Sequence, residues 1–351
     1  MRNTLDHKCP SCSATLKFDP HGQNWKCEYC GGEYNLEDIE SKNEQLTKET
    51  KEVKMQKDQN GMDIYSCPNC GAQIIASETE TATFCVYCRS TAILKNKLVG
   101  EFNPTYVIPF KTTKEDAIEA FKKLKKGRPL MPNAFSDKKN IADMKGVYIP
   151  FWVYDYDVNG IITVDAKRVT SYISGEYHCT KTDVYHVVRE GNLCYDKVPV
   201  DGSTHFDDNL MDSIEPFDYK DLKDFSHSYL SGFLAEKYDV DSEKAEERAI
   251  TRTKNSTIEV LKKDITGYTS TFVKDSNINL NQTEKNYILI PVWMLNIKYK
   301  DKLYKFAMNG QTGKMVGDIP IDKKKAFMWW LGSLLITALI VVIIGFIAGW
   351  L

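Results

Sequence analysis

Eight of the ten cysteines in this 351-residue sequence fall into two sets of four that share one spacing. Each set reads C-x2-C-x14-C-x2-C, and every member of the second set lies 58 positions after its counterpart. The eight are Cys9, Cys12, Cys27, Cys30, Cys67, Cys70, Cys85 and Cys88. Two CxxC turns joined by a β-hairpin are typical of a zinc ribbon, in which four thiolates bind one ion in a tetrahedron. The sequence therefore predicts two β zinc ribbons, each with one Zn²⁺.

The two predicted zinc ions are structural, because four protein ligands leave no open position for a catalytic water. A ribbon of about 35 residues buries too little apolar surface to fold alone. Metal binding, worth on the order of 10 kcal/mol, would supply its folding free energy. Gly31 and Gly71 should permit the positive φ at which the chain leaves a CxxC turn. A redox dithiol, which favours a single CxxC opening a helix, and iron held by four cysteines are the alternatives.

The charge of the chain gives no reason to expect a nucleic-acid partner. The formal net charge is −2 and the pI is near 6.3. Basic and acidic side chains balance within residues 1–36 and again within residues 62–97, which hold the cysteine sets. Because phosphate binding needs clustered lysine and arginine, nucleic acid is an unlikely partner of either ribbon.

Four aromatic residues occupy equivalent or nearly equivalent places in the two ribbons. Trp25 and Phe84 lie shortly before the third cysteine of each set and are expected in the small ribbon cores. Tyr29 and Tyr87 lie inside the second CxxC turn, where an exposed ring is available to a protein partner. We therefore treat the two tyrosines as candidate partner-binding residues.

Residues 37–61 connect the ribbons and are rich in glutamate and lysine, with few apolar positions. This composition predicts a solvated, charged linker. The ribbons would then be separately tethered heads that bind two surfaces, or one surface twice.

The last 26 residues, 326–351, contain no charged side chain. As a helix they exceed the roughly 30 Å hydrocarbon core of a bilayer, so we expect one transmembrane segment. Lysines precede this segment, as the positive-inside rule expects of the cytoplasmic side, and tryptophans lie near both of its ends, where indole rings favour the membrane interface. These flanking residues are Lys323, Lys324, Lys325, Trp329, Trp330 and Trp350. With no apolar signal segment at the amino terminus, the chain is expected to be a tail-anchored protein of the cell membrane whose N-terminal domains are cytoplasmic.

Residues 98–322 predict an α+β cytosolic domain with antiparallel hairpins. A helix over 113–127 and a second over 136–145 should precede a hairpin that turns at Asn159-Gly160, because Asn-Gly is a strong hairpin signal. In order, the predicted parts are ribbon 1 (1–36), the charged linker (37–61), ribbon 2 (62–97), the α+β domain (98–322) and the basic flank with its transmembrane tail anchor (323–351).

The second half of the α+β domain should contain another hairpin, turning at residues 190–192, and a helical stretch over 209–265. Strands should return over 285–318. Trp152 and Trp293 share an I-P-x-W motif and are expected in the core. A binding groove lined by these two tryptophans is the alternative.

No catalytic motif is recognisable. The sequence lacks the motifs GxSxG, HExxH, Walker A and GxGxxG. The segment "NGQTGK" is more typical of a tight turn between strands than of a phosphate-binding loop. Asp201, Ser203 and His205 fall within five positions, which is typical of a loop and not of a catalytic triad. We therefore expect a protein that is not an enzyme.

Two cysteines, Cys179 and Cys194, lie outside the two sets. With His178 and His186 they would make a third donor set. Because His178 and Cys179 are adjacent and suit joint coordination poorly, we predict no third metal site and assign these cysteines no role.

Several segments carry a family resemblance in addition to the two CPxC ribbons and the apolar tail. They are "VIPF", "GVYIPFW", "IEPFDY", "YLSGFLAEKYDVD", "PVWMLNIKY" and "FAMNGQTGKMVGDIPID". Along nearly its whole length the chain resembles the tandem TFIIB-like zinc-ribbon membrane proteins of the YdjG type from Gram-positive bacteria. The resemblance implies that the eight cysteines are zinc ligands, and it brings no catalytic residues. It also implies an envelope-stress (phage-shock-like) setting with PspA-like and SPFH/flotillin-like partners.

These observations together predict a membrane-anchored adaptor whose structural zinc ribbons recruit cytosolic proteins to the membrane. The alternative is a nucleic-acid-binding zinc-ribbon protein of replication or transcription type tethered to the membrane. An enzyme in residues 98–322 is a third reading, which lacks a named nucleophile or acid and base pair.

Overall fold

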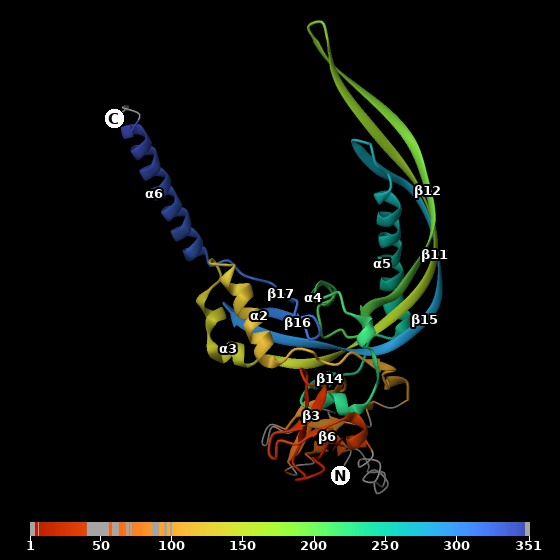
Figure 1. The fold of residues 1–351 in the computed structure, drawn as a ribbon, viewed down its shortest axis with the longest axis vertical. Coiled ribbons are helices and arrows are strands. Elements are labelled where there is room, and N and C mark those ends of the chain that lie inside the picture. The colour runs from red at the N-terminus through yellow and green to blue at the C-terminus, as the bar shows by residue number, and fades with distance from the viewer. Residues whose placement is uncertain are drawn as a thin grey trace.

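The fold is organised by one large β-sheet that runs through the whole molecule (Figure 1). The computed structural model describes residues 4–5, 7–40, 56–57, 63–67, 70, 72–85, 91–94, 97–98 and 100–347. Among these residues, two further three-stranded sheets lie near the N-terminus. The prediction of an α+β chain with antiparallel sheets and one apolar C-terminal helix is confirmed.

Three very long antiparallel strands form the centre of the large sheet. They are β11 (Lys145–Ser174), β12 (Tyr177–Asp201) and β15 (Ser270–Tyr299), with β11 in the middle. At about 3.3 Å per residue, a strand of 30 residues extends for about 100 Å. The outer halves of these strands leave the body of the protein as a curved arm, on whose concave side α5 (Ser242–Lys263) lies (Figure 1).

The predicted turns at Asn159-Gly160 and at residues 190–192 are wrong. Asn159 and Gly160 lie in the middle of β11, where they pair with Asn192 and Gly191 of β12. A Cβ atom at Gly160 would lie 2.9 Å from Cγ2 of Thr257, so glycine is needed here for the close approach of α5. The two strands are instead joined at Gly175, whose φ is +63°.

The predicted helical stretch over 209–265 is correct only at its two ends, α4 (Asp208–Ser213) and α5. In α5 the Asp241 side chain caps the first turn. The residues that α5 buries recur every three or four positions, so they form one stripe along the helix. Between the two helices the chain forms four short elements: η4 (Tyr219–Asp221), β13 (Lys223–Asp224), η5 (His227–Leu230) and β14 (Leu234–Glu236).

The inner halves of the long strands are covered on both faces. Residues 146–154 of β11 are all buried, which is expected of a strand between two layers. One face packs with α2 (Lys114–Lys126) and the N-terminal region, and the other with α4. The predicted helix over 113–127 is confirmed by α2, whose capping box pairs Thr113 with Asp116. Trp152 and Trp293 lie in the core, as predicted.

The remaining elements of the body are short. The helix predicted over 136–145 is smaller than expected, because a 3-10 turn precedes it and β11 begins at residue 145. "NGQTGK" forms the turn before the last strand, as predicted. The elements are η2 (Gly100–Phe102), β10 (Tyr106–Val107), η3 (Asn133–Ser136), α3 (Lys138–Ala142), β16 (Lys302–Asn309) and β17 (Met315–Gly317).

The two N-terminal cysteine-containing modules contribute their own strands. The first has a sheet of β2 (Leu16–Asp19), β3 (Asn24–Cys27) and β4 (Glu33–Tyr34). The second has a sheet of β5 (Gln56–Lys57), β6 (Asp63–Ser66) and β7 (Gln73–Ala76). Three further strands, β1 (Thr4–Leu5), β8 (Glu80–Phe84) and β9 (Thr91–Leu94), join the large sheet.

The expectation of two separately tethered heads is wrong. The second module continues the large sheet, because β8 pairs with β14. The first module packs on η5, where Trp25 Nε1 donates a hydrogen bond of 2.8 Å to the Ser228 carbonyl oxygen. The Phe18 and Trp25 rings also contact the Tyr229 ring. Both modules are therefore attached to the body by contacts between residues that lie far apart in the sequence.

Helix α6 (Lys323–Ile347) is long and apolar enough to cross a membrane, and none of its length is buried in the described structure. Its first turn is attached to the body. The Lys325 ammonium donates hydrogen bonds of 2.7 Å to the Met131 carbonyl and 2.8 Å to Asn133 Oδ1. Figure 1 shows the cysteine-containing modules at one end of the molecule, with α6 and the arm projecting from the other. Trp350 lies outside the described residues.

Candidate metal centres

The first cysteine set forms a compact cluster. The sulfur atoms of Cys9, Cys12, Cys27 and Cys30 all lie within 4.8 Å of one another. The Cys9 and Cys30 sulfurs are 3.6 Å apart, and those of Cys12 and Cys27 are 3.4 Å apart. Four sulfurs at about 2.3 Å from one ion in a tetrahedron lie about 3.8 Å apart, so the cluster has the dimensions of a tetrathiolate site.

The backbone of the first module positions these sulfurs. The β2–β3 hairpin brings the two CxxC turns together, and each turn is closed by backbone hydrogen bonds. Ser13 N donates to the Cys9 carbonyl over 2.9 Å, and Gly31 N donates to the Cys27 carbonyl over 2.9 Å. The φ of Gly31 is +73°, as the sequence predicts for the residue after a CxxC turn. The equivalent Gly71 lies outside the described residues.

The thiols of the first cluster differ in acidity because their surroundings differ. Burial raises the pKa of Cys9, but the Tyr34 hydroxyl, 3.2 Å from the sulfur, and nearby backbone N–H groups outweigh it and lower the pKa to about 6. The backbone of Ala14 lowers the pKa of Cys12, yet burial and the Cys27 sulfur raise it to about 12. Four clustered sulfurs cannot all carry negative charge without a cation. A divalent ion would remove this conflict, so the donor set fits a metal.

The second cysteine set is similar in the part that the structure describes. The sulfurs of Cys67, Cys70 and Cys85 lie within 4.8 Å of one another, and those of Cys70 and Cys85 are 3.7 Å apart. Cys88 and Tyr87 lie outside the described residues. The three placed sulfurs are compatible with a second metal site.

The aromatic residues of the first module have two different roles. Trp25 is only 2% exposed and is shared between the module and the body, so it is more than the local core residue that the sequence predicts. Tyr29, in the turn between Cys27 and Cys30, is 84% exposed. Its ring is therefore available at the surface next to the cysteine cluster, as the candidate partner role requires.

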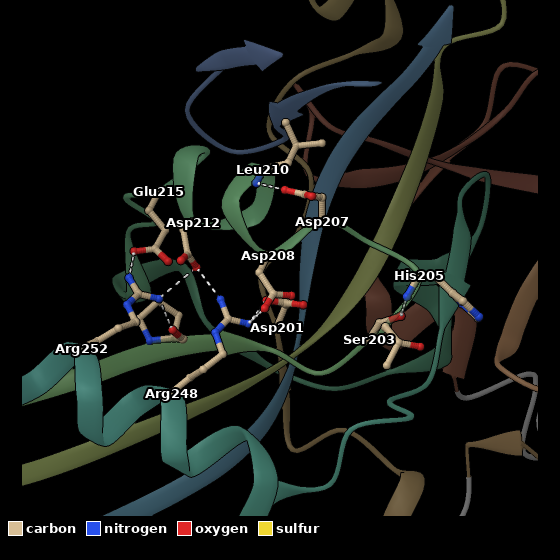
Figure 2. A network of polar contacts seen from close by, with 12 residues as sticks. Asp201, Ser203, His205, Asp207, Asp208, Leu210, Asp212, Glu215, Arg248 and Arg252 are labelled. Carbon is tan, nitrogen blue, oxygen red and sulfur yellow. Dashed lines mark hydrogen bonds and ion pairs between the residues drawn. The ribbon is translucent and has the colours of Figure 1, made fainter. Parts of the chain in front are cut away.

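A partly buried ionic network lies between β12, α4 and α5 (Figure 2). Arg248 contacts Asp201 over 2.8 Å and Asp212 over 3.0 Å, and Arg252 contacts Glu215 over 2.7 Å. Burial raises the pKa of Asp201 although Arg248 opposes this shift. The network attaches α5 to the body. Sequence reasoning missed it, although arginines four positions apart in a helix lie on one face.

Asp201, Ser203 and His205 are not arranged as a catalytic triad (Figure 2). Asp201 is paired with Arg248. His205 Nδ1 lies 3.0 Å from Glu236 Oε2, and the Ser203 hydroxyl donates to the same oxygen over 3.4 Å. Ser203 and His205 therefore both bind the Glu236 carboxylate. This arrangement attaches the loop to β14, and it does not place the histidine as a base for the serine hydroxyl.

The cysteines outside the two sets lie in the arm. In the β12 pairing with β11, Cys179 lies opposite Tyr172 and Cys194 lies opposite Asp157. His186 Nδ1 contacts Asp165 over 2.5 Å. These residues are spread along β12, and within the described residues they do not form a donor cluster.

Comparison with known proteins places the chain in a family. It is 36% identical over 328 residues to the Bacillus subtilis (strain 168) protein described as uncharacterized protein YdjG. The aligned region covers 93% of this chain and 94% of YdjG. No protein-family model matches the sequence, and no solved structure matches the chain. Since the similarity extends over nearly the full length of both proteins, the chain belongs to the YdjG family.

Proposed function

We propose that this protein is a non-enzymatic, membrane-anchored adaptor. Two zinc ribbons present a binding surface to cytosolic proteins, and α6 holds that surface at the cell membrane. The single observation that supports this proposal best is the attachment of the cysteine modules and α6 to one body, by the Trp25 and Lys325 hydrogen bonds. An adaptor needs this connection between the partner-binding part and the anchor.

Zinc is the metal that we propose for both cysteine clusters. The sulfur spacing of the first cluster and the sulfur-only donor set favour a tetrahedral, closed site, which zinc prefers as a structural ion. Cys88 is the proposed fourth ligand of the second site, by analogy with Cys30. Elemental analysis of the purified chain should find two zinc ions, and iron in place of zinc would contradict the assignment.

The anchor that we propose is α6, with the preceding residues in the cytoplasm. A helix of 25 residues is about 37 Å long, which exceeds the hydrocarbon core. Lys323, Lys324 and Lys325 precede the apolar segment and favour the cytoplasmic side. Deletion of residues 326–351 should release the protein and its partners into the soluble fraction, and partners that stay at the membrane would contradict the adaptor role.

The partner surface that we propose is centred on Tyr29. The family resemblance suggests PspA-like and SPFH/flotillin-like proteins as partners. Replacing Tyr29 by alanine should abolish capture of such a partner from membranes without loss of zinc. Tyr177 is a matched control, because it is similarly exposed but lies at the tip of the arm. Equal capture by Tyr29→Ala and Tyr177→Ala would contradict a role of the first ribbon.

The same preparation distinguishes the adaptor from a membrane-tethered nucleic-acid-binding protein. The full-length chain in detergent should not shift DNA or RNA in a gel. A shift that weakens steeply with added salt would favour the nucleic-acid alternative, because counterion release gives phosphate binding that dependence.

A further inference from the structure

An apolar groove with a basic rim lies between α2 and the segment formed by η3 and α3. Its volume is about 530 Å³, within the range of small-molecule sites. The α2 side chains that line it, Ile118, Phe121, Lys122 and Lys125 among them, recur at three- and four-residue intervals. This spacing places them on one face of the helix.

The bottom of the groove is aromatic and firmly packed. Phe121 and Phe135 line it, and both side chains are fully buried. Their ring centroids lie 5.0 Å and 5.8 Å from that of Phe306 in β16. Ile118 and Ile141 also line the groove. Because its bottom belongs to the core of the body, the groove is preformed and suits a flexible hydrocarbon chain.

The rim of the groove is basic. Four lysines line it, Lys122, Lys125, Lys126 and Lys138, and no acidic side chain does so among the described residues. Among the residues that the structure describes, none of these four lysines forms an ion pair with a carboxylate. The neighbouring Lys123, in contrast, is paired with Glu119. The rim therefore complements an anionic group.

The groove and the start of α6 share contacts with the same short segment of the body. The Lys325 ammonium binds the Met131 carbonyl and Asn133 Oδ1, and η3, which begins at Asn133, also provides Phe135. If α6 spans the membrane as proposed above, the groove lies close to the lipid headgroups. A hydrocarbon-lined groove with cationic side chains at that depth matches a lipid with an anionic headgroup.

We propose that this groove binds an acidic glycerophospholipid. One acyl chain lies along Ile118, Ile141 and Ala142, above the buried Phe121 and Phe135, and the phosphate contacts the lysines of the rim. The proposal rests on the membrane anchoring for the position of the groove, but the binding itself depends only on the body. Its consequence is that anionic lipid would fix the orientation of the body next to α6.

The test uses the full-length protein in neutral detergent, titrated with dioctanoyl phosphatidylglycerol or dioctanoyl phosphatidylcholine and measured by native mass spectrometry. The variant carries Lys122→Gln, Lys125→Gln and Lys138→Gln. The control removes the same charge from exposed lysines of α5 and the arm, with Lys254→Gln, Lys263→Gln and Lys274→Gln.

Phosphatidylglycerol should bind more tightly than phosphatidylcholine, and the groove variant should lose about tenfold in affinity, roughly one charge-assisted contact. The control should bind like the unmodified protein. A second variant, Ala142→Trp, fills the groove without changing the charge and should weaken binding with an unchanged melting curve. Glycerol 3-phosphate should not displace the lipid, because it lacks the acyl chain.

Equal affinity for the two lipids, equal loss in both lysine variants, or full displacement by glycerol 3-phosphate would overturn the proposal. Retention of a protein segment instead of lipid in the groove would overturn it as well. Failure of the anchoring is detected separately, because the chain would then not sediment with membranes even if phosphatidylglycerol still bound selectively in detergent.

Discussion

The Cys9 sulfur lies 3.2 Å from the Tyr34 hydroxyl, which in turn lies 2.7 Å from the Ser11 hydroxyl. Hydrogen bonds of this kind orient a thiolate and stabilise its charge, as contacts behind metal ligands commonly do. At the scale of single residues, the cysteine sites therefore depend on their neighbours as well as on the four sulfurs.

Replacing Cys9 by serine should reduce the zinc content from two ions per chain to one. The first ribbon would then lose most of the folding free energy that metal binding supplies, on the order of 10 kcal/mol. Elemental analysis and chemical denaturation of the detergent-solubilised chain measure both effects. Cys194→Ser is the control, because Cys194 is exposed and belongs to neither set. Two ions in the Cys9→Ser variant would refute the ligand assignment.

The pH dependence of stability should include a contribution from His205. Its hydrogen bond with Glu236 raises the pKa of His205 above the ordinary value, so the folded chain holds this proton more tightly than the unfolded chain. The stabilisation is complete below the unfolded pKa of about 6.5 and is lost as the pH rises through the folded pKa. Burial raises the pKa of Glu236, so protonation of that carboxyl sets the lower limit of the window.

As the pH rises through the interval above about 6.5, the His205→Gln variant should therefore lose less stability than the unmodified protein. Urea unfolding midpoints across this interval measure the difference. His178→Gln, at the tip of the arm, is the control and should keep the slope. An unchanged slope in His205→Gln would show that the pair with Glu236 does not contribute.

At the scale of elements, the packing of the arm depends on the close approach of α5 to β11 and β12. Gly160 and Gly191 pair with each other, and a Cβ atom at either would lie within 3.1 Å of an α5 side chain. Thr257 and Leu261 of α5 occupy that space. The two glycines thus have a packing role in strands where the sequence alone suggests turns.

Replacing Gly160 by valine should destabilise the protein by about 1–3 kcal/mol, because the new side chain overlaps Thr257. A β-branched residue would otherwise favour a strand, so a stabilising result would contradict the packing argument. Denaturant unfolding measures the change. Gly127→Val is the matched control, since no atom lies within 4 Å of a Cβ at Gly127, and it should cost much less.

At the scale of the whole molecule, the N-terminal modules, the body and the start of α6 are connected by direct contacts. The β8–β14 pairing and the Trp25 hydrogen bond join the modules to the body, and the Lys325 hydrogen bonds join α6. Folding of the cysteine modules should therefore be coupled to packing of the body surface between residues 226 and 236.

Removal of the metal with a chelator should increase amide hydrogen exchange in β2, β3 and η5 together. Exchange in α5 should change little, because α5 packs on the arm. Hydrogen-exchange mass spectrometry of the full-length chain measures both regions. Increased exchange confined to the cysteine modules would show that their contact with the body does not depend on the metal.

The candidate metal ligands and the long apolar helix α6 could be predicted from sequence because local patterns determine them. A CxxC turn brings two sulfurs together within four residues, and an uncharged run of 26 residues has the length of a membrane span. Helix α2 was predictable for the same reason, since its capping box and apolar face are also local.

Only the tertiary structure decided where these parts lie relative to one another. An Asn-Gly pair favours a turn when its neighbours are free, but at Gly160 the packing of α5 on a continuous strand overrides that preference. Trp25 finds its hydrogen-bond partner 203 positions away, at Ser228. By itself the sequence determined the local chemistry, the cysteine pairs and the apolar tail. The attachment of the modules, the arm and the groove beside α6 depends on contacts between distant residues, which no local pattern encodes.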